Sequence, residues 1–259
     1  MHPDLFNIGP LAFHTYGLFV CVGFITALLV TAKMAETSGT TPHQVLDMAL
    51  LIVLCAIIGS RTMYILLNLT YYINNPLDMF KFWEGGLGFS GGLVVSLLAI
   101  TWYIKRHRLS FWGTADLWAP AAALGQGIGR IGCFMAGCCY GKSTDLPWGI
   151  IFSHPKSLAP LHVPLHPTQI YSALTGFIIF LVLMWLRARK QFEGQVTLWF
   201  LILHSSARLL VERFRGDPRG MVPGTDMSVT QLVSLLILLS SVLGLYLMKA
   251  RNREGRYTN

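Results

Sequence analysis

The sequence predicts an all-α integral membrane protein with seven transmembrane helices. Of its 259 residues, 53% are hydrophobic and only 12% are charged, whereas a soluble domain carries about 25% charged residues. The mean hydropathy is +0.54. The apolar residues fall into runs of about 20, the length that a helix needs to cross the hydrocarbon core of a bilayer. We therefore expect a single integral membrane domain over residues 1–259.

The first three apolar runs cover residues 16–34, 46–69 and 87–104. The first is expected to be retained, because the N-terminal stretch has neither a basic region before its apolar run nor a small-residue cleavage site. The third begins in the glycine-rich sequence WEGGLGFSGGL at residues 83–93. Glycines there permit either anion binding by backbone amides at a helix N-terminus or close packing against a neighbouring helix. Both interpretations remain open.

The other four apolar runs cover residues 117–135, 168–186, 195–214 and 229–249. The run at 117–135 is the weakest of the seven, since it is rich in glycine and alanine and is interrupted by Gln126 and Arg130. Small residues of this kind let membrane helices approach closely. The segment at 136–167 is too long for a plain connector, and its apolar residues Trp148 and Phe152 argue against disorder.

The placement of basic residues predicts the orientation. Eleven lysines and arginines lie in the connections on one side of the expected bundle and six lie on the other. The more basic side of a membrane protein faces the cytoplasm. We therefore expect the N-terminus outside, the C-terminus in the cytoplasm, and an outward-facing loop at 136–167. Nucleic-acid binding is not expected despite a net charge of +8, because it needs a solvated basic face.

Polar side chains interrupt several of the apolar runs: Arg61, Arg130, His204, Arg208 and Glu212. Positions 204, 208, 212 and 215 share one helical face, which must point into the bundle because a charge inside the membrane is costly. Internal ion pairs, such as Glu212 with Arg61 or with Arg215, are one explanation. An interior with more arginine than carboxylate also favours an anion, and guanidinium binds phosphate through two parallel hydrogen bonds. We therefore expect Arg130 and Arg208 to hold a phospholipid headgroup together.

Three of the five cysteines, Cys133, Cys138 and Cys139, lie close together in the sequence. Cys21 and Cys55 lie within apolar runs and are expected to be core residues. The spacing of the three clustered cysteines, even with nearby histidines, is not the paired spacing of typical zinc sites, so it predicts no metal site. Cys138 and Cys139 could be redox active or could form a disulfide, and the spacing does not decide between these.

The sequence GRIGCFMAGCCYG at residues 129–141 resembles the signature of the bacterial prolipoprotein diacylglyceryl transferase family. The resemblance extends over most of the chain, in matching order and spacing. It includes IGPLAFHTYGLF at 8–19, GSRTMYILLN at 59–68, HPTQIYSAL at 166–174 and RLLVERFRGDP at 208–218.

The resemblance implies a multi-pass enzyme of the bacterial inner (plasma) membrane with no metal or organic cofactor. Such an enzyme transfers diacylglyceryl from phosphatidylglycerol to the lipobox cysteine thiol of a preprolipoprotein and releases glycerol-1-phosphate. Its expected partners are phosphatidylglycerol, the signal peptide with its lipobox and the surrounding membrane lipids. By position, Tyr16, Arg130, Gly141 and Arg208 correspond to functional residues of the family. The expected catalytic residues are Arg130, Arg208, His204 and Tyr16, and those expected to bind substrate are Arg130, Arg208, Gly141, Ser90, His14, Arg61 and Glu212.

The chain departs from the family pattern at four positions. Ser90 stands where the family has a histidine, Cys133 and Cys138 replace an asparagine and a glutamate, and His204 replaces a tyrosine. A serine cannot serve as a base at neutral pH as a histidine can. Either His204 or His14 supplies the base, or the thiolate forms without one, or the enzyme uses a different acceptor. A non-enzymatic lipid-binding or transport protein is a further alternative, but it predicts internal repeats, and we find no convincing one.

Overall fold

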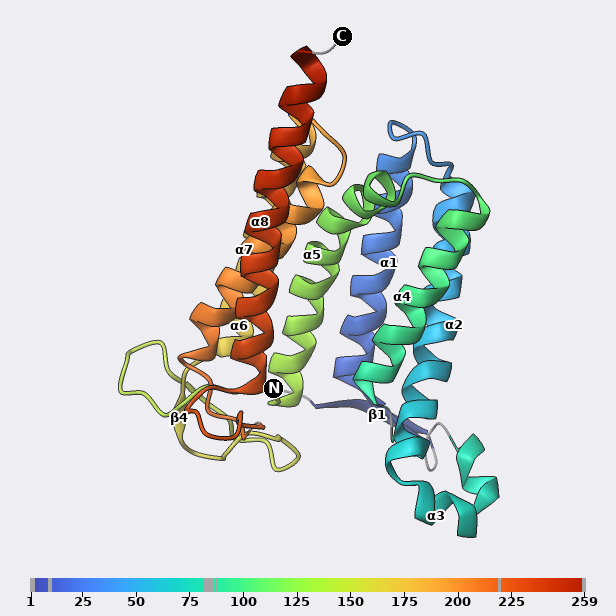
Figure 1. Cartoon of the computed structure of the whole chain (residues 1–259). Helices are drawn as coiled ribbons and strands as arrows, with labels where there is room; N and C mark the ends of the chain where they lie inside the picture. Colours follow the sequence, from blue (N-terminus) through green and yellow to red (C-terminus); the bar gives the residue numbers. More distant parts are fainter. Residues whose placement is uncertain (1–2, 9–10, 82–85, 87, 219, 258–259) are drawn as a thin grey trace. The chain divides into compact units, whose positions relative to one another are not determined.

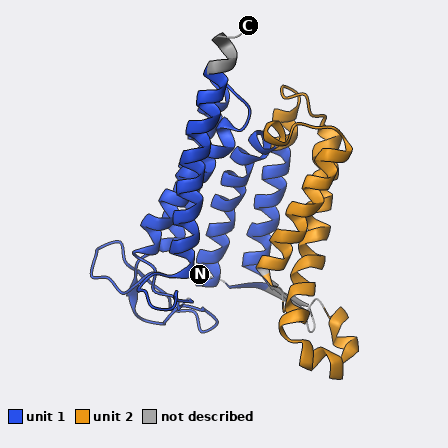
Figure 2. Cartoon of the chain, viewed as in Figure 1, with its two compact units in different colours: residues 1–30, 115–259 blue, residues 31–114 orange. Residues whose placement is uncertain are grey.

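The computed structural model describes residues 3–8, 11–81, 86, 88–218 and 220–257, and these are predominantly α-helical (Figure 1). The chain divides into two compact units (Figure 2). The first contains residues 1–30 and 115–259, and the second contains residues 31–114.

A long helix occupies each of the seven segments that the apolar runs predict. The helices are α1 (Thr15–Ala35), α2 (Pro42–Leu67), α4 (Phe89–Arg106), α5 (Phe111–Ala136), α6 (Thr168–Arg187), α7 (Gln195–Glu212) and α8 (Val229–Tyr257). Four of the described helices, Thr15–Ala35, Pro42–Leu67, Thr168–Arg187 and Val229–Arg253, are long and apolar enough to cross a membrane. The chain is therefore a helical membrane protein.

The second unit consists mainly of α2 and α4, with the short helices α3 (Leu69–Asn74) and η1 (Pro76–Phe80) between them. Helix α2 begins with a capping box, in which Thr41 and Gln44 each accept a hydrogen bond from the other's backbone amide, and Pro42 follows the cap. A Cβ atom on Gly59 of α2 would lie 2.6 Å from the Gly91 carbonyl oxygen of α4. The end of the glycine-rich segment therefore packs closely against α2, whereas residues 83–85 and 87 lie outside the described residues.

The first unit packs α5 closely against two neighbours. A Cβ on Gly23 of α1 would lie 2.8 Å from the Gly125 carbonyl oxygen, and one on Gly176 of α6 would lie 2.9 Å from the Gly127 Cα. The small residues of α5 thus bring backbones together, as the sequence predicts. An apolar core then joins α5, α6 and α7 around Ala123, and it also contains Ala119, Ile179, Leu183 and Val196.

The N-terminal end of α7 is attached to α5 by a buried carboxylate. Asp116 is 2% exposed and accepts hydrogen bonds from the Gly194 amide at 2.9 Å and from the Thr197 amide at 2.8 Å. It also accepts from the Thr197 hydroxyl at 2.9 Å. These are otherwise unsatisfied donors at a helix N-terminus, where a negative charge is favourable.

The segment at 136–167 is ordered, as its apolar residues predict. Strand β3 (Ile150–Ile151) pairs antiparallel with β4 (Pro164–Leu165), and Phe152, Ala159 and Leu165 form a small buried core. At the N-terminus, β1 (Asp4–Ile8) pairs antiparallel with β2 (Leu11–His14), which leads directly into α1.

Candidate functional site

Three hollows follow one another within the first unit, and neighbouring hollows share wall residues. The smallest, of about 20 Å³, is lined by Arg130, His204, Arg208 and Gln126. The second, of about 380 Å³, is lined by Gln126, Arg130, Tyr16 and the cysteine residues 133, 138 and 139. The third, of about 520 Å³, is lined by Tyr16, Cys138, His14, Asp4 and Lys156. We call the last two the thiol hollow and the outer hollow.

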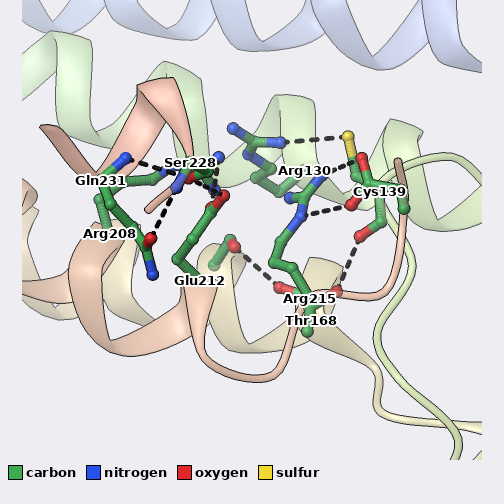
Figure 3. A network of polar contacts seen from close by, with 10 residues as sticks. Arg130, Cys139, Thr168, Arg208, Glu212, Arg215, Ser228 and Gln231 are labelled. Carbon is green, nitrogen blue, oxygen red and sulfur yellow. Dashed lines mark hydrogen bonds and ion pairs between the residues drawn. The ribbon is translucent and has the colours of Figure 1, made fainter. Parts of the chain in front are cut away.

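The two expected phosphate ligands, Arg130 and Arg208, have different surroundings (Figure 3). The Arg208 Nη2 atom lies 2.9 Å from Oε2 of Glu212, one helical turn away, in a pair whose side chains are 13% and 5% exposed. Ser228 donates a second hydrogen bond to Glu212 at 3.0 Å. Among the residues that the structure describes, Arg130 forms no ion pair with a carboxylate. Its charge is thus available to a ligand.

The cavity between these two arginines is too small for a phosphate. Its volume of about 20 Å³ is room for about one water molecule. Both arginines line this one cavity, and the expectation that they hold a headgroup together stays a prediction. The thiol hollow is large enough for a headgroup, since ligand sites have volumes of about 300–1,000 Å³, and it is lined by Arg130 alone of the two.

A third arginine, Arg215, lies beside the cysteines just after α7. Its side chain is 2% exposed, and its Nε and Nη2 atoms donate to the two carboxylate oxygens of Asp217 at 2.8 and 2.9 Å. Asp217 therefore takes the place of Glu212, which the sequence offers as a partner of Arg215. Hydrogen bonds from the Cys133 and Cys138 thiols, together with the charge of Arg215, lower the pKa of the Cys139 thiol below its usual range. Arg130 Nη1 lies 3.6 Å from the Cys139 sulfur.

His204 lies in the smallest cavity with Arg130 and Arg208, as the stripe on α7 predicts. Its ring stacks on Phe200, with 5.6 Å between the ring centroids and an interplanar angle of 24°. His204 does not line the thiol hollow.

Tyr16 and His14 lie at the start of α1, where β2 ends. Tyr16 lines both the thiol hollow and the outer hollow. The Nδ1 atom of His14 lies 2.8 Å from Oδ1 of Asp4, and Lys156 of the long loop pairs with the other oxygen of that carboxylate. Hydrogen bonds from Lys156 and His14 lower the pKa of Asp4 below its usual range. Asp4 thus holds one imidazole nitrogen of His14 and leaves the other available to a ligand.

Gly141 positions the loop and does not line any of the three hollows. A Cβ atom there would lie 2.5 Å from the His166 carbonyl oxygen and 2.9 Å from the Phe214 carbonyl oxygen. The Gly141 amide donates to that His166 oxygen at 3.1 Å. A larger residue at this position would clash with the backbone at His166, just before α6, and at Phe214, just after α7. Only glycine lets the segment after the cysteines pass between them.

Arg61 and Ser90 belong to the second unit. The Arg61 side chain is buried and donates to the carbonyl oxygens of Asp78, Met79 and Gly86. It lines a hollow of about 360 Å³ together with Tyr64 and Tyr72, whose rings it contacts. Ser90 is exposed in the first turn of α4.

The structure adds residues that sequence reasoning passes over. Thr168 donates to the Cys139 carbonyl at 2.7 Å, and Gln169 donates to the Cys138 carbonyl at 2.8 Å. Both side chains are almost completely buried. In the sequence, these two hydrogen-bonding side chains stand at the start of the apolar run at 168–186, and this position could have indicated that they bind a neighbouring segment. Gln126, one turn before Arg130, lines two hollows, and the four-residue spacing indicates this.

The arrangement places an arginine charge and a group of thiols around one hollow. A phosphate can accept hydrogen bonds from the Arg130 guanidinium there, and a thiol or its thiolate can lie within reach of the same group. Group transfer between a phosphate ester and a thiol is chemistry that such a site supports.

Comparison with known proteins gives the family. Residues 3–247 match the family model described as prolipoprotein diacylglyceryl transferase. Three similar proteins bear the name phosphatidylglycerol–prolipoprotein diacylglyceryl transferase. The protein of Clostridium tetani is 33% identical over 93% of this chain and 96% of its own length. That of Vibrio cholerae is 35% identical over 98% and 93%, and that of Geobacter sulfurreducens is 39% identical over 90% and 89%.

Proposed function

Because this chain belongs to the prolipoprotein diacylglyceryl transferase family, we propose that it transfers diacylglyceryl from phosphatidylglycerol to the lipobox cysteine of a preprolipoprotein. The acceptor sulfur attacks the glycerol carbon that carries the phosphodiester oxygen, so that a carbon–sulfur bond forms as the carbon–oxygen bond breaks. The leaving oxygen keeps the bonding electron pair, and glycerol-1-phosphate departs. The acceptor thiol loses its proton to a base or to solvent.

The observation that carries the proposal is the position of Arg130. It lines a hollow of headgroup size and forms no ion pair with a carboxylate among the described residues. We assign to it the phosphate of phosphatidylglycerol, whose charge increases on the leaving oxygen in the transition state. Hydrogen-bond donors fixed at such a position accelerate the reaction because they need not reorganise.

Arg208 has a supporting role in this scheme. Its partner Glu212 balances its charge. Arg208 lines the same small cavity as Arg130, so we assign to it the positioning of the Arg130 side chain. Tyr16, on the other wall of the thiol hollow, is positioned to contact the substrate.

The two histidines line different hollows: His14 lines the outer hollow and His204 lines the smallest one. His14 lines the outer hollow with Cys138 and is oriented by Asp4, so we assign to it the acceptor side and the thiol proton. A base held by a carboxylate in this way keeps its free nitrogen directed at its substrate. His204 lies beside Arg130 and Arg208, so we assign to it the phosphate side.

The orientation of the protein follows from its basic connections. We propose seven spans in the inner membrane, with the N-terminus and the loop at 136–167 outside. The thiol and outer hollows, at the end of α5 nearest that loop, then face the compartment into which a preprolipoprotein signal peptide emerges.

The test is an assay of purified protein in detergent with phosphatidylglycerol and a lipobox peptide. We expect a thioether-linked diacylglyceryl peptide and an equal amount of glycerol-1-phosphate. The Arg130→Ala variant should lose this activity, whereas Arg189→Ala, at the exposed end of α6, should retain it. Release of glycerol-1-phosphate without peptide modification would indicate a different acceptor, and absence of both products would refute the proposal.

A further inference from the structure

The C-terminal end of α5 brings three thiols together. The sulfur atoms of Cys133, Cys138 and Cys139 all lie within 4.8 Å of one another. All three cysteines are free, with Cys133 buried in the last turn of α5 and the other two half-buried in the segment that follows. They line one wall of the thiol hollow.

The backbone that carries these sulfur atoms is fixed in a tight reversal. Gly137 and Cys139 both have left-handed backbone conformations, with φ of 74° and 64°. A side chain at such a φ is strained, so the conformation of Cys139 needs support from its surroundings. Thr168 and Gln169, which are 0% and 1% exposed, provide it through their hydrogen bonds to the Cys139 and Cys138 carbonyls. The sulfur atoms are thus held together before any ligand binds.

We propose that Cys133, Cys138 and Cys139 bind one Zn²⁺ ion whose fourth coordination position faces the thiol hollow. Sulfur ligands lie about 2.3 Å from zinc, which places them about 3.8 Å from one another in a tetrahedron. Small side-chain rotations bring the observed sulfur atoms to that separation. Catalytic zinc sites have this number of ligands, with three from the protein and one open position, and thiolates are ligands that zinc favours.

The charges around the thiols suit such a complex. Three thiolates and one Zn²⁺ ion carry a net charge of −1, which a half-buried site must balance. Arg130 lies 3.6 Å from the Cys139 sulfur, and the charge of Arg215 acts on the same sulfur. Arg215 already has Asp217 as a partner, whereas Arg130 forms no ion pair with a carboxylate among the described residues. An anionic zinc complex would give Arg130 a partner of opposite charge.

The zinc site would act on the acceptor, and this part of the inference rests on the proposed transfer to a cysteine. The lipobox thiol occupies the open position and loses its proton, because a thiol that coordinates zinc is deprotonated. The proton passes into the outer hollow, where His14 lies. The bound sulfur then attacks the glycerol carbon of the phosphatidylglycerol held by Arg130. The resulting thioether carries no charge, so it binds the metal more weakly and leaves.

Metal binding can be tested without any turnover. Reduced full-length protein in detergent is titrated with Co²⁺ under anaerobic conditions, and the thiolate-to-cobalt charge-transfer absorption is recorded. We expect one equivalent to bind with tetrahedral sulfur coordination. Cys133→Ala, Cys138→Ala and Cys139→Ala should each weaken binding at least about 100-fold. Cys21→Ala and Cys55→Ala should leave it unchanged, as these cysteines lie outside the cluster.

Absence of a thiolate–cobalt signal would overturn the proposal. So would equal binding by the Cys138→Ala variant, or an intact mass showing that two of the three thiols are joined in a disulfide in freshly purified protein.

A second experiment separates the metal site from the transferase function. Addition of a lipobox peptide with its cysteine should change the spectrum of the cobalt-loaded protein, whereas the serine analogue should not. Diacylglyceryl transfer is then measured on metal-free and zinc-loaded protein. Equal rates would remove the role of zinc and leave the transferase standing. Tight metal binding without transfer in either form would refute the proposed function and leave the metal site standing.

Discussion

Replacement of Arg130 by alanine should strongly lower the rate of diacylglyceryl transfer while changing the free energy of unfolding little. Two charge-assisted hydrogen bonds to phosphate contribute about 1.5–3 kcal/mol each, so their loss should lower kcat/KM by about 10²- to 10⁴-fold. Because Arg130 is in no ion pair with a carboxylate among the described residues, its removal leaves no carboxylate without a partner. The free energy of unfolding should therefore change by less than about 1 kcal/mol.

Arg208→Ala is the matched comparison, because Arg208 lines the same small cavity. Its removal leaves Glu212, 5% exposed, without its cation, and breaking a buried ion pair costs about 3–5 kcal/mol. The double variant Arg208→Met with Glu212→Leu removes both charges and should recover most of that loss. Arg208→Ala should thus lower stability and activity together, whereas Arg130→Ala should lower activity alone.

The measurements are kcat/KM for thioether formation and reversible unfolding of each variant in the same detergent. Arg130→Lys serves as a further control, since it keeps the charge but loses the planar pair of donors, and it should retain an intermediate rate. If Arg130→Ala keeps more than about a tenth of the activity, the assignment of the phosphate to this residue is wrong. If Arg208→Ala is as stable as the unmodified protein, the energetic role of the Glu212 pair is wrong.

Three further variants test the packing and the electrostatics of the first unit. Gly176→Ala places a Cβ 2.9 Å from the Gly127 backbone and should lower thermal stability by about 1–3 kcal/mol, whereas Gly17→Ala, with open space around it, should not. Asp116→Ala removes the acceptor of the α7 amides and should cost about 1–3 kcal/mol in denaturant unfolding; an unchanged midpoint would contradict this. Asp4 has a pKa below its usual range, so its contact with the long loop should persist above about pH 4 and be lost as the pH falls further. The protection of that loop against hydrogen exchange, relative to the intrinsic exchange rate at each pH, should then fall in acid, and Asp4→Asn should remove this pH dependence.

The helices could be predicted from the sequence because their signals are local. Each apolar run of about 20 residues became a helix, although α2 begins at Pro42, four residues before the run at 46–69, because Thr41 caps it there. The close approach of α5 to its neighbours also follows from its glycines. The partner of Glu212 was missed, although a pair four residues apart on one helix is the nearest available contact. Arg215 is only three residues from Glu212, but it lies beyond the end of α7 and pairs with Asp217. Glu212 pairs with Arg208 within the helix.

The cysteine cluster could not be predicted from spacing. A segment of four residues separates Cys133 from Cys138, and the outcome depends on whether the chain continues the helix or reverses. A left-handed Gly137, a left-handed Cys139 and two hydrogen bonds from the start of α6 make it reverse. Those hydrogen bonds join residues about thirty positions apart in the sequence, so they are a property of the fold. The rule for zinc sites assumes paired ligands within one loop and does not apply to this geometry.

The proposed zinc site accounts for three of the four departures from the family pattern, those at Ser90, Cys133 and Cys138, through one change in chemistry. An enzyme that removes the thiol proton with a histidine loses that base when a serine stands in its place, as Ser90 does in this sequence. A coordinated thiol needs no strong base, since the metal itself favours the thiolate, and a weakly basic residue such as His14 or a water molecule then accepts the proton. The loss of the histidine is compensated when the metal lowers the pKa of the acceptor thiol. Cys133 and Cys138, which replace an asparagine and a glutamate, supply two of the three proposed zinc ligands. Each of these substitutions therefore depends on the other, because neither cysteine alone completes the ligand set.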